Sequence, residues 1–266
     1  MKKNILALVV TLFVVMQTMA QTYDNLWKQA NTFSQKDLPK SEIGVMRKII
    51  SKATMAKDYG QLLAAEMRQT MLWKSISTDS LTPAIQRMKK QEQQAADPVL
   101  KAVWNAVLGK LYKEYVYYID AGDEGEQTSL YRVNKAKAQE YFMKALAQPE
   151  LLARHASTEY APLTMRGLDG ASFDNDLLHL IGFEADSKEA YLKMYTYYNK
   201  VGKRGAACLC AFEVIQKYRQ DDVREVKKSK YLNAIDSLIH VYQDIPEAGE
   251  LAVEHYRFME EATDIK

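Results

Sequence analysis

The stretch SKEAYLKMYTYYNKVGKRGAACLCAFEVIQKY, residues 187–218, decides the fold class. Apolar and aromatic side chains recur in it every three or four residues, the spacing that places side chains on one face of an α-helix. The pattern is interrupted by the short polar segment Lys200–Lys203, in which Gly202 suits a tight turn. We therefore predict a hairpin of two helices, over residues 187–199 and 204–218.

The same pattern recurs in pairs elsewhere along the chain. Residues 40–56 pair with 59–75, and residues 229–242 pair with 246–261, each across a short polar turn. Proline fits the first turn of a helix because the amide that it lacks would have no partner there. Five of the six prolines precede a periodic apolar pattern: Pro39, Pro83, Pro98, Pro149 and Pro246. No segment alternates as a half-buried strand does. We predict an all-α fold, a helical-hairpin repeat array, with loops at 121–129, 157–171 and 184–186.

The hairpin at 187–218 resembles the tetratricopeptide repeat (TPR). Tyr198, Gly202 and Ala207 stand at spacings found in that repeat. There an aromatic residue packs the first helix, a glycine opens the turn, and an alanine lets the second helix approach closely. The next pair begins about 36 residues after Ser187, which is close to the period of the repeat. Other positions of the repeat do not match, so the resemblance implies a degenerate, TPR-like α-solenoid.

The first twenty residues have the pattern of a secretory signal peptide. Lys2 and Lys3 precede an uncharged apolar run over residues 5–16, and Thr18-Met19-Ala20 supplies small residues at the cleavage positions. An uncleaved anchor is the alternative, but the apolar run is short for a membrane span. We expect cleavage after Ala20, export to the periplasm or beyond it to the cell surface or medium, and no stable membrane anchor in the mature chain.

These patterns together predict four regions. They are the signal peptide at 1–20, an N-terminal helical-repeat subdomain at 21–156, a loop and short-helix connector at 157–186, and C-terminal TPR-like hairpins at 187–266.

The charge balance argues against nucleic acid as a partner. The chain has 36 Lys+Arg and 34 Asp+Glu, and the predicted signal peptide removes Lys2 and Lys3, so the mature chain has a formal net charge of zero. A neutral protein has no general attraction to a phosphate backbone or to an anionic lipid surface. The basic residues Arg224, Lys227, Lys228 and Lys230 are offset by Asp221, Asp222 and Glu225, which favours a solvated helix face.

Cys208 and Cys210 raise the question of a metal clip, a redox pair or a reactive thiol. Residues two apart on an α-helix point about 200° away from each other, so these two cannot readily form a disulfide or bind one metal ion. The four histidines are scattered singly, without the spacing of a zinc site. The neighbours of both cysteines are small or apolar. We predict that both thiols are packed in the core.

Other candidates for chemistry are weak. The segment DAGDEG, residues 120–125, lacks ligands that a calcium loop needs and favours an exposed turn. Asp174, Asp176 and His179 offer metal ligands, but acids also suit the N-terminus of a helix. Motifs of serine hydrolases, zinc proteases and phosphate-binding loops are missing from the sequence. We predict no catalytic, cofactor-binding or metal-binding residues and no cofactor.

Tyrosine is frequent, with 17 residues, and clusters on two segments. Its apolar ring and polar hydroxyl suit both helix packing and binding surfaces. Packing is the simpler reading for any single tyrosine. As a set they fit a curved helical array whose concave face binds a protein segment. We predict a partner-binding surface formed by Tyr112, Tyr115, Tyr191, Tyr195 and Tyr198.

Two segments carry a resemblance to a known family: YDNLWKQANTFSQKDLPKSEIGVMRKIISKATMAKDYGQLLAAEMRQTMLWK, residues 23–74, and PLTMRGLDGASFDNDLLHLIGFEA, residues 162–185. The chain resembles, from Tyr23 to about Tyr242, the N-terminal helical region of large bacterial alpha-2-macroglobulin-like proteins. The resemblance implies an exported protein of a protease-inhibitor family that traps proteases. Cys208 is followed by Leu209, Cys210 and Ala211, which departs from the Cys-x-Glu-Gln thioester of some members. None of the family's inhibitory residues therefore has a counterpart here.

The sequence as a whole predicts an exported, non-catalytic helical-repeat interaction scaffold with a protein partner, which the family resemblance implies to be a protease. One alternative is a free-standing periplasmic TPR-like adaptor that binds a peptide or an envelope complex. Another is an all-α enzyme acting on polysaccharide, which would need two convergent carboxylates in a deep cleft. The scaffold could also be the N-terminal portion of a longer protein.

Overall fold

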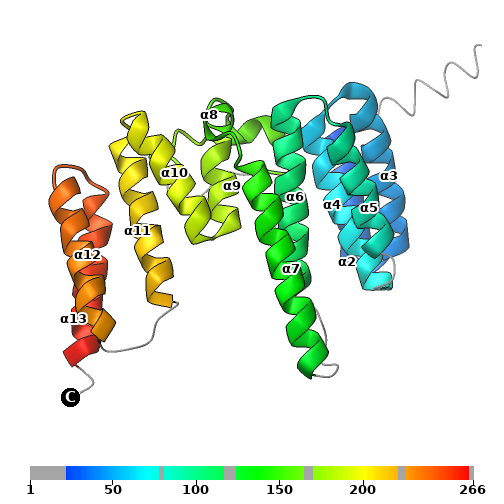
Figure 1. Ribbon diagram of the computed structural model, residues 1–266. Coiled ribbons are helices and arrows are strands. Elements are labelled where there is room, and N and C mark those ends of the chain that lie inside the picture. The colour runs from blue at the N-terminus through cyan, green and yellow to red at the C-terminus, as the bar shows by residue number, and fades with distance from the viewer. Residues whose placement is uncertain (1–21, 78–80, 117–123, 165–169, 221–225, 264–266) are drawn as a thin grey trace, which may run out of the picture. The chain divides into compact units, whose positions relative to one another are not determined.

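The computed structural model describes residues 22–77, 81–116, 124–164, 170–220 and 226–263 (Figure 1). The described residues form helices and turns, with no β-strand and only an isolated bridge between Ala156 and Asp176. The α-helices are α2 (Tyr23–Gln35), α3 (Pro39–Ala56), α4 (Tyr59–Ile76), α5 (Leu81–Gln94), α6 (Pro98–Val116), α7 (Glu124–Ala145), α8 (Pro149–Leu152), α9 (Leu177–Ala185), α10 (Lys188–Lys200), α11 (Arg204–Gln220), α12 (Val226–Tyr242) and α13 (Ala248–Thr263), and Ser157–Tyr160 is a 3-10 helix. The predicted all-α fold is confirmed.

Helix starts follow the chemistry expected at unpaired backbone amides. Pro39, Pro98 and Pro149 each occupy the first position of a helix. Asp97 caps α6, because its carboxylate accepts a 2.8 Å hydrogen bond from the amide of Leu100. Asp58 and Ser187 cap α4 and α10 in the same way.

The chain divides into two compact units. The first contains the residues up to Gln94 together with Tyr160–Thr164, and here α2 packs on α3, α3 on α4, and α4 on α5. Its apolar core gathers side chains from α2, α3 and α4: Leu26, Ala30, Val45, Met46, Ile49 and Ala65.

Two buried carboxylates cross-link the helices of this first unit. Glu42 of α3 is 1% exposed and accepts a 2.5 Å hydrogen bond from Arg68 of α4. Glu66 of α4 is 3% exposed and accepts a 2.8 Å hydrogen bond from Arg87 of α5. A carboxylate in such a position needs a cationic partner, so each pair fixes how one helix lies against the next.

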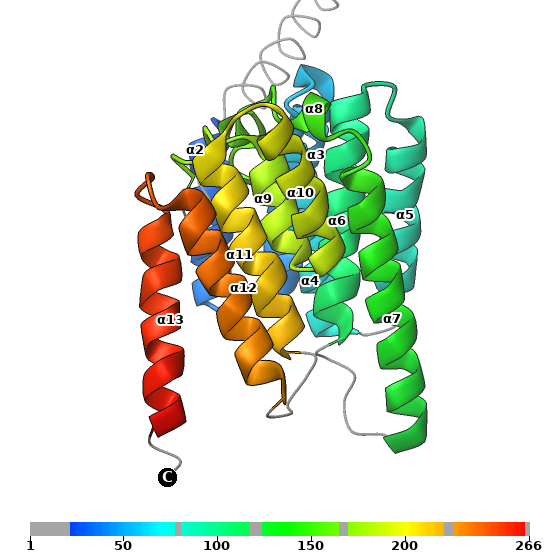
Figure 2. The ribbon, with the colours of Figure 1, turned by 60° about the vertical axis from the view of Figure 1, so that its left-hand side comes forward.

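The second unit contains Ala95–Glu159 and the residues from 165 onward. Within it α6 packs on α7, and both contact α9, which packs in turn against α10. From there each helix packs on the next, so that α10 with α11 and α12 with α13 form two successive hairpins (Figures 1 and 2). A quasi-one-dimensional order of this kind is the mark of helical repeat proteins.

The hairpin predicted from residues 187–218 is α10 and α11. Gly202 adopts a φ of 77° in the turn between them, a left-handed conformation that glycine reaches without strain. Tyr198 and Ala207 are fully buried, as the TPR-like packing requires. The pairs predicted at 40–56 with 59–75 and at 229–242 with 246–261 are α3 with α4 and α12 with α13.

The structure differs from the predicted loop boundaries in two places. The predicted loop at 184–186 is wrong at residues 184 and 185, because α9 continues to Ala185. The predicted loop at 121–129 is wrong from residue 124 onward, because α7 begins at Glu124; residues 120–123 of the DAGDEG segment lie outside the described residues. The regions expected at 21–156, 157–186 and 187–266 stay a prediction. The compact units of the structure divide after Gln94, and α6 and α7 pack with α9 within the second unit.

Among the residues that the structure describes, no helix is long and apolar enough to cross a membrane. The predicted signal peptide at 1–20 lies outside these residues.

Candidate interaction site at the last two hairpins

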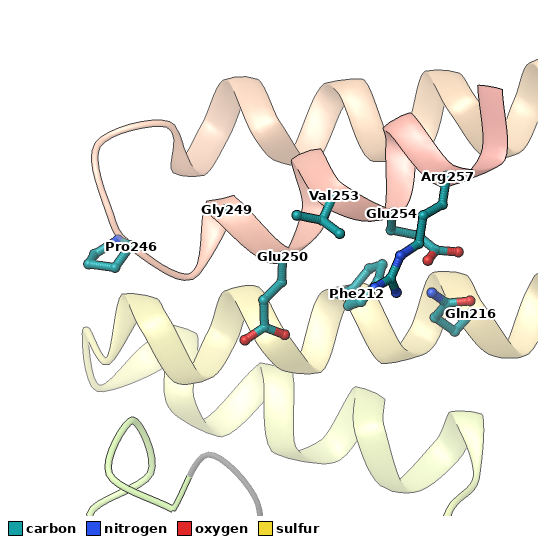
Figure 3. Close-up of a pocket in the computed structure, with 8 residues that line it drawn as sticks. All are labelled: Phe212, Gln216, Pro246, Gly249, Glu250, Val253, Glu254 and Arg257. Carbon is teal, nitrogen blue, oxygen red and sulfur yellow. The ribbon is translucent and has the colours of Figure 1, made fainter. Parts of the chain in front are cut away.

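A groove runs between α11 and α13, the second helices of the last two hairpins (Figure 3). Its volume is about 460 Å³, within the usual range of ligand pockets. Phe212 and Gln216 line it from α11, and the other lining residues belong to α13 and the turn before it: Pro246, Gly249, Glu250, Val253, Glu254 and Arg257. Because the lining residues of α13 recur every three or four positions from Gly249 to Arg257, this wall of the groove follows the helix axis.

Hydrogen bonds at the turn before α13 fix the walls of the groove. Arg204, the first residue of α11, donates to both carboxylate oxygens of Asp244 and donates a 2.9 Å hydrogen bond to the carbonyl of Val241. The hydrogen bond from Arg204 raises the pKa of this guanidinium and lowers that of the Asp244 carboxyl. This pairing ties the start of α11 to the end of α12.

A second contact at the same turn involves Glu247. Its side chain lies against Gly205 of α11, where a Cβ atom would collide with it. The hydroxyl of Ser172 donates a 2.9 Å hydrogen bond to Glu247 Oε1. Glycine at position 205 therefore lets the turn of one hairpin sit directly on the helix of the previous one.

The groove combines apolar and charged side chains. Phe212 and Val253 supply the apolar part, while Glu250 and Arg257 extend from α13 toward α11 (Figure 3). Glu254 accepts a 3.0 Å hydrogen bond from the hydroxyl of Tyr231 on α12, which orients one acid. Such a lining suits a protein segment that places an apolar side chain between polar contacts.

Three of the five tyrosines predicted to bind a partner are buried. Tyr198 donates to Asp176 at 2.8 Å, and Tyr191 donates to Asp186 at 2.9 Å. The ring of Tyr112 stacks on Tyr141 with centroids 5.6 Å apart. These three rings therefore pack helices of the second unit against their neighbours.

The other two predicted tyrosines differ from this group. Tyr195 is half-buried and shares a hydrogen bond with Tyr242 of α12. The side chain of Tyr115 lies outside the described part of the chain. The predicted tyrosine surface stays a prediction, and Tyr112, Tyr191 and Tyr198 have little exposed area to offer to it.

Asp176, one of the candidate metal ligands, caps α9. It is 2% exposed, and one of its carboxylate oxygens accepts from the amide of His179 at 2.8 Å and from the Tyr198 hydroxyl. His179 stacks on Phe173 with ring centroids 4.1 Å apart. Asp174 is exposed and pairs with Lys203 at 2.8 Å. Within the described ranges no three His, Cys, Asp or Glu side chains are placed to bind a metal ion.

Burial makes the Asp176 carboxyl pH-sensitive. Desolvation raises its pKa from 3.8 to about 6, against the opposing effects of the His179 amide, Tyr198 and Lys203. The folded chain then binds a proton more tightly than the unfolded chain, so this group destabilises the fold as pH rises from about 4 to 6. Over this interval the wild type should lose up to about 2 kcal/mol of its free energy of unfolding because of this carboxyl group. The variant Asp176→Asn should not show that loss when both proteins are compared by urea titration. Equal pH profiles would contradict this.

Cys208 and Cys210 are free, fully buried thiols of α11, as their neighbours predicted. Burial raises the pKa of Cys208 to about 12 and that of Cys210 well above its usual range. The thiolate is the reactive form of cysteine. We therefore expect Ellman's reagent at pH 8 to label both thiols much more slowly in the native chain than in the urea-unfolded chain. Rapid labelling of either native thiol would show that α11 does not bury it.

Alanine at both cysteine positions should lower stability through lost buried volume, by about 1–2 kcal/mol in total. Partner binding is expected to persist, because neither thiol reaches the groove surface. A loss of binding at unchanged stability would overturn the packing assignment. Urea titration and a binding measurement on the same double variant test this.

The comparisons with known proteins add no family. No protein-family model matches the sequence, and no curated protein is significantly similar to it.

The groove itself was not predicted from the sequence. Its lining residues on α11 and α13 are more than 30 positions apart in the sequence, so no local spacing indicates the groove. One signal was available: Val253, Tyr256 and Met259 add apolar residues to α13 beyond the stripe that packs on α12.

Proposed function

We propose that this protein is an exported, non-catalytic helical-repeat scaffold that binds a protein partner through its last two hairpins. The observation that carries the proposal is the groove between α11 and α13, which lies where one hairpin stacks on the next. Repeat arrays bind through extended surfaces of this kind, because stacking leaves grooves that run along the helices.

The roles of the buried polar groups support a scaffold rather than an enzyme. Glu42 and Glu66 are bound by arginines from neighbouring helices, and Asp176 caps α9 while accepting from Tyr198. Each of these carboxylates joins two elements of the fold. The polysaccharide-acting alternative needs two carboxylates that face a cleft, and the groove residues Glu250 and Glu254 instead lie one turn apart on a single helix.

The family resemblance supports the finer part of the proposal. In that reading the helices form the N-terminal module of an alpha-2-macroglobulin-like trap, and the partners are proteases. The TPR-like adaptor is the second candidate, because the groove lies between helices of two successive hairpins and is lined by apolar and charged side chains. In both cases the predicted signal peptide directs the mature chain, from residue 21, to the periplasm or the cell surface.

Fractionation of the native cells tests export and separates the two candidates. An antibody against residues 21–266 is used to probe cytoplasmic, envelope and medium fractions, and the N-terminus of the detected protein is determined. We expect a chain outside the cytoplasm that begins at Gln21. A cytoplasmic chain that still carries Met1 would overturn export. A band many times larger than this chain favours the trap, and a band at the mature size favours the adaptor.

A further inference from the structure

The α11 helix shows how one hairpin packs against the next. Three of its residues contribute to a single apolar cluster with α12 and α13: Cys208, Phe212 and Ile215. They are the fifth, ninth and twelfth residues of the helix, so they lie along one face. Tyr231 and Ile235 of α12 supply the opposite side of that cluster.

The α13 helix repeats this face in the same register. Its fifth, ninth and twelfth residues are Ala252, Tyr256 and Met259, again a small, an aromatic and an unbranched or aliphatic apolar side chain. Leu251 and Phe258, which lie elsewhere around the helix, pack into the cluster with α12. The repeated face is therefore additional to the one that α13 uses within its own hairpin.

The two faces differ in what covers them. Cys208 is fully buried under the next hairpin, whereas Tyr256 is 63% exposed and Met259 is 45% exposed. Ala252 is exposed as well. Large apolar side chains gathered on one exposed helix face mark an interaction site more often than scattered ones do.

Two glycines give independent evidence that α11 and α13 carry corresponding faces. Gly205 and Gly249 are the second residues of α11 and α13. At Gly205 the side chain of Glu247, from the turn of the next hairpin, fills the space that a Cβ atom would take. At Gly249 no atom lies within 4 Å of that position. The place where a turn carboxylate would sit is present on α13 and open.

The first described helix contrasts with α13. The exposed side chains of α2 are polar or charged throughout: Asp24, Asn25, Lys28, Asn31, Thr32, Ser34 and Gln35. A polar outer face is what a capping helix of a repeat array presents to water. In the part of the chain that the structure describes, the outer face of α13 instead exposes Tyr256 and Met259.

We propose that the outer face of α13 is an acceptor for a further helical hairpin, carried by a partner protein. This hairpin has an aromatic and aliphatic stripe on its first helix, like Tyr231 and Ile235 here, and a carboxylate in its turn, like Glu247, that packs against Gly249. The inference rests on the proposed scaffold function and names the kind of partner that the scaffold binds.

A second copy of this chain does not offer such a hairpin in the part that the structure describes. Tyr231 and Ile235 are already buried against α11, and Glu247 is already seated on Gly205. The exposed face of α2 is polar. We therefore place the matching surface outside the described residues of this chain, on a partner protein. Detection of a native protein many times larger than this chain would instead favour a following segment of the same protein.

An engineered repeat tests the acceptor face directly. Residues 221–266 are appended a second time, directly after Asp264, so that the added hairpin follows α13 with the connection that links α12 to α11. Hydrogen exchange is then measured in the original α13. We expect its amides to exchange at least about tenfold more slowly than in the natural chain, and the added hairpin to be protected.

One variant and one control decide the result. Tyr256→Glu in the original α13 should remove the added protection, whereas Leu192→Glu, at an exposed apolar residue of α10, should leave it. An added hairpin that exchanges like an unfolded chain, while the rest of the protein is unchanged, would overturn the acceptor face. So would equal protection with and without Tyr256→Glu.

Sedimentation of the unmodified chain addresses the identity of the partner. We expect a monomer at micromolar concentration. A dimer that Tyr256→Glu converts to a monomer would overturn the heterologous partner in favour of a second copy. These results are independent of where the protein is located, so they can fail while the fractionation succeeds, and the reverse.

Discussion

Replacing Tyr198 with alanine is expected to lower the free energy of unfolding of the second unit by about 4 kcal/mol. The ring is fully buried and packs edge-on against Phe173, with centroids 5.2 Å apart. Its hydroxyl donates to both carboxylate oxygens of Asp176, at 2.8 and 3.1 Å. Alanine removes the ring and also leaves the buried cap of α9 without one of its donors.

Two further variants separate the ring from the hydroxyl. Tyr198→Phe keeps the ring and should cost about 1.5–3 kcal/mol, the usual effect of a lost buried hydrogen bond to a charged group. Tyr197→Ala is the matched control, because the neighbouring ring is only half-buried. Chemical denaturation followed by circular dichroism measures all three. A Tyr198→Ala effect no larger than that of Tyr197→Ala would contradict the role assigned to Tyr198.

The second large effect is expected at Arg87 in the first unit. Arg87→Met removes the cation that faces Glu66, a carboxylate whose side chain is 4% exposed. We expect a loss of about 2–3 kcal/mol, below the range for a fully buried pair because the Arg87 side chain is 39% exposed. Replacing both residues, as Glu66→Met with Arg87→Met, should restore most of the stability, since no unpaired charge then remains in the core.

This pair is measured as a double-mutant cycle with hydrogen exchange across α4 and α5. Protection should fall in Arg87→Met and recover in the double variant. If the double variant were as unstable as the sum of the two single variants, the two side chains would not be coupled, and the ion pair would have no part in joining these helices.

Periodicity predicted the helices because it is a local property. The hairpin at 187–218 needs only the spacing of its apolar residues and the glycine at 202, and all of these act within a few turns of one another. The burial of Cys208 and Cys210 followed from the same neighbours. Proline is an equally local signal, and Pro39, Pro98 and Pro149 each stand at the first position of a helix.

The packing between elements could not be predicted from these local patterns. Arg68 and Glu42 are 26 residues apart, and Arg87 and Glu66 are 21 apart, so no single helix pattern pairs them. The tyrosines show the ambiguity most clearly, because a tyrosine that packs a core and one that binds a partner have the same sequence signal. Phe212 is partly buried and Tyr256 is exposed, although both are the ninth residue of their helix. This difference in exposure depends on packing between helices, which a local pattern does not contain.

Photo-crosslinking in the native cells tests whether the protein binds a partner through its last two hairpins. A photoreactive residue is placed at Met259 on the outer face of α13, at Val253 in the groove, and at Lys28 on the polar face of α2 as the control. We expect one crosslinked product of defined mass from Met259 or Val253, containing a second protein, and none from Lys28. Products from Lys28 alone, or none from any of the three positions, would contradict it.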